Sequence, residues 1–140
     1  MKGGKPVRVM VERLRRGDDV LDQLNHIVRA NEIIAASFTA LGAVEKASVG
    51  FFVENGRYST VSYDGPLEVL SCVGNVSSKE GKPFVHAHIA IADKEGNAYG
   101  GHLMPGCIVS ATFEVTMLVY EDIDLVSKLD SETKLYLLDT

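Results

Sequence analysis

Three of the four histidines in this 140-residue chain lie between positions 86 and 102, in a stretch that otherwise has the pattern of two β-strands. His86 and His88 belong to the first of these strands, and His102 belongs to the second. Residues two apart on a strand point to the same side of a sheet, roughly 6.5 Å from each other. His86 and His88 can therefore present two imidazoles to one point in space, and His102 would add a third nitrogen.

A group of three neutral imidazoles without a carboxylate is a ligand set that suits zinc better than nickel, copper or iron. Three protein ligands leave one zinc coordination position open, where water or another ligand can bind. A bound water whose pKa falls toward neutrality can act as a nucleophile. The sequence therefore predicts a zinc site at these histidines, whereas it assigns no catalytic residue and leaves enzyme status open. Three other side chains are weaker candidates for an extra ligand or a base: Glu68, Glu114 and Cys107.

The register of the hairpin decides whether His102 reaches the other two histidines. A four-residue loop over Asp93–Gly96 pairs His88 with Gly101 and turns His102 to the opposite side of the sheet. A five-residue loop, or a bulge at the paired glycines 100 and 101, places His88 directly opposite His102. The sequence allows both registers. A symmetric assembly offers a third arrangement, in which a neighbouring subunit supplies His102.

The charge and the cysteine count exclude several classes of protein. The formal net charge is −5 and the isoelectric point about 5.3, which argues against binding duplex DNA by phosphate neutralisation. Cys72 and Cys107 are too few for a disulfide scaffold and lie in apolar, strand-like contexts. We find no signal peptide and no run long enough to span a bilayer, so we expect a cytoplasmic protein without a membrane partner. The first 16 residues are basic, which fits a solvated end better than a nucleic-acid contact: Lys2, Lys5, Arg8, Arg13, Arg15 and Arg16.

One helix is predicted near the start of the chain. Residues 6–13 alternate apolar and polar side chains, as a half-buried strand does. Asp18 or Asp19 can cap a helix over about 19–31, in which apolar residues recur at helical spacing. His26 lies on this helix, away from the other histidines, and is interpreted as a surface or satisfied structural histidine rather than a ligand.

The rest of the chain has the pattern of successive strands. Asn55-Gly56 is a strong hairpin signal, Asp64-Gly65-Pro66 predicts a further turn, and residues 77–83 are polar and loop-like. The predicted strands cover residues 34–41, 44–54, 57–63, 67–76, 84–92, 98–103 and 107–121, with a last apolar run at 135–138. The expected fold class is α+β, in one domain over 1–140, with a largely antiparallel β-sheet and one main helix packed on it.

Two strands are apolar on much of both faces, at 84–92 and 107–120, although only one helix is available to cover the sheet. Self-association is the simplest way to cover the second face, and cyclic symmetry is usual in such assemblies. Barrel-like curvature of the sheet is the alternative.

Several blocks of the sequence resemble the plants-and-prokaryotes-conserved (PPC) domain family, in its stand-alone prokaryotic form. One is Gly65-Pro66-Leu67-Glu68-Val69-Leu70-Ser71, followed by Gly74-Asn75-Val76. The others are residues 86–96, Gly100-Gly101-His102-Leu103 and Gly106-Cys107-Ile108-Val109, together with Gly17-Asp18-Asp19-Val20-Leu21 and its helix. The resemblance covers nearly the whole chain.

The resemblance implies an antiparallel sheet with a packed helix, a homotrimer, and zinc at His86, His88 and His102. Plant members follow AT-hooks in nuclear proteins, and many prokaryotic members are labelled as DNA-binding. This sequence carries no Arg-Gly-Arg-Pro hook, since Arg15-Arg16-Gly17-Asp18 is not one. The main hypothesis is a zinc-binding homotrimer of open biochemical role. The alternatives are a DNA-associated regulatory protein and a pure protein-protein assembly module.

Overall fold

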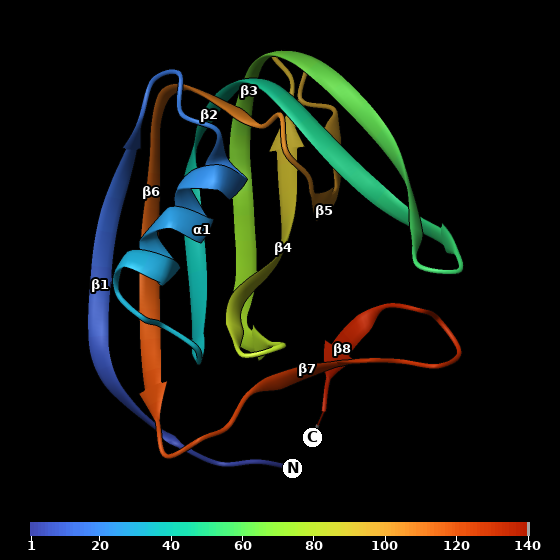
Figure 1. Cartoon of the computed structure of the whole chain (residues 1–140). Helices are drawn as coiled ribbons and strands as arrows, with labels where there is room; N and C mark the ends of the chain where they lie inside the picture. Colours follow the sequence, from blue (N-terminus) through green and yellow to red (C-terminus); the bar gives the residue numbers. More distant parts are fainter. Residues whose placement is uncertain (140) are drawn as a thin grey trace.

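The computed structural model of the chain describes residues 1–139, which form one helix and eight strands (Figure 1). This confirms the expected α+β class with a mainly antiparallel sheet. In chain order the elements are β1 (Lys5–Arg15), α1 (Val20–Ala30), β2 (Ala36–Glu54), β3 (Arg57–Lys79), β4 (Lys82–Ala92), β5 (Ala98–Leu103), β6 (Ile108–Glu121), β7 (Val126–Leu129) and β8 (Tyr136–Leu138).

All strands belong to one sheet in the order β1-β6-β2-β5-β4-β3-β7-β8. The pairs are antiparallel except β3 with β7, which is parallel. β2 also pairs with β3, so β2, β3, β4 and β5 close into a four-strand barrel. The curvature that the sequence left as an alternative is therefore present. It brings β5 beside both β4 and β2.

β2 and β3 are each continuous where the sequence predicted two shorter strands. The expected turn at Asp64-Gly65-Pro66 is wrong, because Lys46 pairs with Asp64 and Val44 pairs with Leu67 across a shift in register. The extra residues form a bulge, where the missing N–H of proline removes no ladder hydrogen bond. The predicted loop over 77–83 is also shorter, since β3 continues to Lys79 and β4 begins at Lys82.

Asp19 caps α1 as expected. One carboxylate oxygen of Asp19 accepts a hydrogen bond from Asp22 N at 3.1 Å, and the other accepts one from Gly106 N at 2.6 Å. The cap thus fixes the start of the helix to the segment that precedes β6. The helix buries Val20, Leu24 and Val28 against the sheet and leaves His26 exposed, the first of the two roles expected for it.

The face of the sheet that lies away from α1 carries polar and exposed apolar side chains. Cross-strand partners share a face of a sheet, and on this face one row of partners runs from β1 to β5. Val11 and Val73 in this row are 73% and 48% exposed. The row consists of Val11, Thr116, Thr39, Val73, His88 and His102. We call this surface, with the neighbouring exposed Val9, Leu41, Leu70 and Leu118, the outer face.

Among the residues that the structure describes, no helix has the length and apolar character needed to cross a membrane.

Candidate metal centre

The β4–β5 hairpin has the register that brings the histidines together. Ala92 pairs with Ala98 and His88 pairs with His102, so the loop holds five residues and no bulge interrupts the pairing. Asp93 stabilises this loop, because its Oδ1 accepts hydrogen bonds from Glu95 N at 3.0 Å and Asn97 N at 2.9 Å. Hydrogen bonds from Asn97 also hold the pKa of Asp93 below its ordinary value.

Asp93 is a site-organising residue that the sequence analysis did not single out. An aspartate that begins a loop, with amide donors two and four residues later, is an Asx-type signal that could have selected the five-residue loop.

Gly100 and Gly101 allow β5 to lie close to β4 and β2, and no bulge forms at them. A Cβ atom at position 100 would lie 2.6 Å from Ile89 O, and one at position 101 would lie 2.9 Å from Gly50 O. Both contacts are with backbone, so any larger residue would push β5 away from β4 or β2. Gly50 pairs with His102. Because positions 100 and 101 carry no side chain, β5 lies close to β4 and β2, and His102 comes within reach of the other two histidines.

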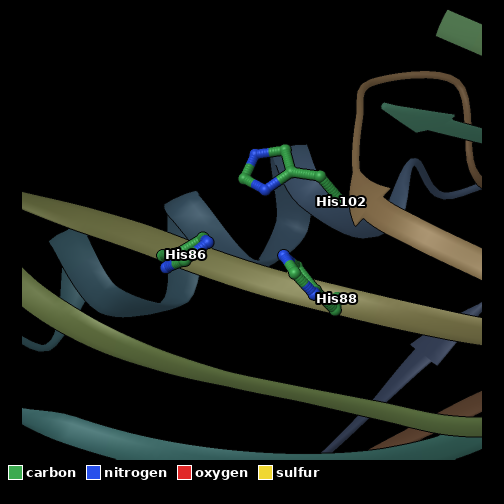
Figure 2. A group of neighbouring side chains, drawn as sticks. All are labelled: His86, His88 and His102. Carbon is green, nitrogen blue, oxygen red and sulfur yellow. The ribbon is translucent and has the colours of Figure 1, made fainter. Parts of the chain in front are cut away.

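The three imidazoles converge on one point (Figure 2). One nitrogen of each ring lies within 4.8 Å of the corresponding nitrogens of the other two. The ring centroids are 5.4 Å apart for His86 and His88, and 5.1 Å apart for His86 and His102. Nitrogen ligands at 2.0–2.1 Å from a tetrahedral ion lie about 3.4 Å from each other, a spacing that small side-chain rotations can reach from here.

The electrostatics of the cluster suit a cation. Burial, and then the neighbouring His86 and His88, lower the pKa of His102 to about 4. Burial and His88 also lower the pKa of His86. Both rings are therefore neutral at pH 7 and keep a free lone pair. The buried Nδ1 of His102 has no hydrogen-bond partner among the described residues, which is unusual for a buried polar atom unless an ion or water satisfies it.

The weaker candidate ligands are not part of this cluster. Among the described residues the group contains only the three histidines, while Glu68 and Glu114 are exposed on β3 and β6. Cys107 is a core residue whose thiol donates to Ser48 O at 3.3 Å, and burial raises its pKa to about 11. Cys72 is a second free, buried thiol.

Tyr58 is a neighbour of the site that sequence reasoning missed. Its ring lies against His102, with centroids 4.7 Å apart. Tyr58 lies on β3 just after the Asn55-Gly56 turn and reaches His102 only because the barrel closes. No local signal in the sequence could have revealed this contact.

The metal-free protein is expected to lose stability as the pH falls from about 6.5 to about 4. The unfolded chain binds a proton on His102 near pH 6.5, whereas the folded chain does so only near pH 4. Between these values the unfolded state holds more protons, so acidification favours unfolding. Because the ring is half-buried and solvent screens it, we expect a loss of about 1 kcal/mol. Thermal unfolding with a chelator present measures it, and an equal pH slope in His102→Ala would contradict this explanation.

The fold is that of a small α+β protein, and this chain places three histidines on two neighbouring strands of its sheet. Residues 1–121 match the family model of the Plants and Prokaryotes Conserved domain, abbreviated PCC or PPC, and the chain therefore belongs to this family. This confirms the resemblance seen in the sequence.

Two solved structures share the fold over almost their whole length. The PPC protein of Pyrococcus horikoshii superposes with a TM-score of 0.90 at 27% identity, covering 99% of this chain and 95% of that one. AF0104 of Archaeoglobus fulgidus, described as a metal-containing protein, has a TM-score of 0.89 at 31% identity, covering 100% of this chain and 99% of that one.

A curated relative contains a similar segment within a much longer chain. The bifunctional protein GlmU of Synechococcus sp. (strain JA-3-3Ab) is 30% identical over 112 residues. The match covers 79% of this chain but only 17% of that protein.

Proposed function

We propose that this protein is a zinc-binding homotrimer of the PPC family, with zinc held by His86, His88 and His102 and one coordination position open. The observation that carries the proposal is the convergence of three imidazole nitrogens within 4.8 Å of one another. The description of the Archaeoglobus relative as metal-containing supports it. Zinc is preferred because the donor set is three neutral imidazoles without a carboxylate or thiolate.

When bound, zinc would act as a Lewis acid toward a ligand or water at its open position. The residues of this chain supply the three donors and restrict their motion. Tyr58 packs against the His102 ring. The close contact of β5 with β4 and β2 limits movement of the β5 backbone that carries His102. Such support keeps a ligand set in place.

Metal analysis of protein purified without a nickel column tests the proposal. We expect about one zinc ion per chain, and almost none in the double variant His86→Ala/His88→Ala. The matched control is His26→Ala, which removes the exposed histidine of α1 and should leave the zinc content unchanged. Equal zinc in the double variant and the unaltered protein would reject the site and favour a pure assembly module.

The outer face supports the proposed trimer. Its exposed apolar residues include Val9, Leu70 and Leu118, at 64%, 57% and 38% exposure. Exposed apolar residues gathered on one face mark an interaction site, and copies of the same chain are the occupants we propose. Because His88 and His102 end the same row of cross-strand partners, the zinc site would lie at the edge of the subunit interface.

The cytoplasm is the location that we propose for this protein. Cys72 and Cys107 are free and buried, which fits a compartment that keeps thiols reduced.

DNA association is the second candidate function, and the basic residues around β1 are the feature that favours it. Phosphate neutralisation needs a positive face, whereas the whole chain carries a formal charge of −5. We therefore expect no measurable binding of a duplex at low salt, where electrostatic attraction is strongest. A fluorescence titration at about 50 mM and about 200 mM salt checks this. Tight binding that weakens steeply with salt would establish DNA association instead.

A further inference from the structure

A pocket of about 380 Å³ lies beside the histidine cluster. His86 and His102 line it, together with residues 134–137, which include the first two residues of β8. The β2–β3 hairpin contributes Gly56 to the lining, and Gly56 N donates to Thr133 O at 2.8 Å. Figure 1 shows the tip of this hairpin and the loop between β7 and β8 on the same side of the molecule. A ligand in this pocket would touch both the metal site and the C-terminal segment.

The pocket is basic although the protein is acidic. Lys79 and Lys134 line it, and no aspartate or glutamate within residues 1–139 does. A larger pocket beside β1 and β6, by contrast, has Glu32, Glu121 and Asp122 in its wall. With a divalent ion at the histidines, the positive potential of the pocket would rise further. This charge pattern fits an anionic ligand.

Lys79 is held in place by aromatic rings rather than by an ion pair. Its Nζ lies 3.6 Å from the centre of the Tyr136 ring and 5.1 Å from that of Phe84. Cation–π contacts position an ammonium group without neutralising it. Among the described residues no carboxylate forms an ion pair with Lys79. Nearby Glu80 accepts a hydrogen bond from the Tyr136 hydroxyl and does not line the pocket.

The remaining lining favours a ligand with an apolar body. Tyr58, Phe84, Leu135 and Leu137 supply aromatic and aliphatic surface. The volume falls in the range of small-molecule sites, which combine apolar walls with a few fixed polar groups. The wall at residues 134–137 lies beyond residues 1–121, which match the family model, so selectivity would come from a part of the chain outside that match.

We propose that this pocket binds a small organic carboxylate, with the carboxylate held by Lys79 and Lys134 next to the metal and the apolar body against Phe84 and Leu135. The inference rests on the zinc site proposed above and names the ligand class of that site. Lys79 supplies a positive charge held by aromatic rings, and the exposed Lys134 supplies a second. Both charges line the same pocket as the two histidines.

Ligand-observed NMR on zinc-loaded protein tests the proposal with benzoate and benzamide, which have the same shape and differ in charge. We expect benzoate to bind at least about tenfold more tightly than benzamide. Lys79→Met should remove this preference, and Lys134→Met should weaken it. The control is Lys82→Met, because Lys82 pairs with Lys79 across the β3–β4 turn but does not line the pocket. Circular dichroism checks that each variant is folded.

Different outcomes separate this inference from the zinc proposal. If the protein holds no zinc but benzoate binding still depends on Lys79, the zinc site fails and the carboxylate pocket stands. If zinc is bound and benzoate binds no better than benzamide, the pocket assignment is overturned alone. Inorganic phosphate that binds more tightly than benzoate, with the same dependence on Lys79, would also overturn the assignment to an organic carboxylate.

Discussion

The double substitution Val11→Glu/Leu70→Glu is expected to convert the proposed trimer of 15.2 kDa chains into monomers. Both replaced side chains lie on the outer face and are exposed in the single chain, at 73% for Val11 and 57% for Leu70. The substitutions should therefore not disturb the core. In a trimer they would bury unpaired carboxylates, which the interface could not tolerate. Light scattering coupled to size exclusion measures the mass.

The matched control for this experiment is Leu129→Glu. Leu129 is 57% exposed on β7, away from the outer face, so this variant should keep the mass of the unaltered protein. A trimer that persists in Val11→Glu/Leu70→Glu would place the subunit interface elsewhere. A monomer in the unaltered protein would refute the trimer itself.

The substitution Gly74→Val is expected to destabilise the fold by about 3 kcal/mol and to weaken metal binding. A Cβ atom there would overlap the Phe38 ring and lie 2.6 Å from His86 O. Phe38 is buried in the core, so the ring has little room to move. The strain would instead separate β3 from β4 next to the first histidine of the cluster. Denaturant unfolding and a zinc titration measure the two effects.

Gly3→Val is the control for this substitution. No atom lies within 4 Å of a Cβ at Gly3, so stability should change by less than about 0.5 kcal/mol. If Gly74→Val were as stable as this control, the close packing between β3, Phe38 and the backbone of β4 would not limit the fold. If it were destabilised but still bound zinc normally, the cluster would not depend on the spacing of β3 and β4.

Local patterns in the sequence were sufficient for the elements whose signals act over a few residues. The helix was predicted because apolar residues recur at helical spacing after Asp19, which caps α1 in the structure. The hairpin at Asn55-Gly56 was predicted because both residues tolerate positive φ, which they adopt at 48° and 73°. The prediction that β2 and β3 would each be two shorter strands was wrong. Glycine and proline, which usually mark turns, here lie at bulges within continuous strands.

The types and spacing of His86 and His88 determined by themselves that two imidazoles share one side of a strand, since side-chain direction alternates with a period of two. Only the tertiary structure decided that His102 joins them. That depends on the loop ordered by Asp93 and on how closely β5 approaches Gly50. The basic pocket likewise requires Lys79 and Lys134, 55 positions apart in the chain, to meet at one cavity. Contacts across such separations follow from packing of whole strands, which short-range spacing does not encode.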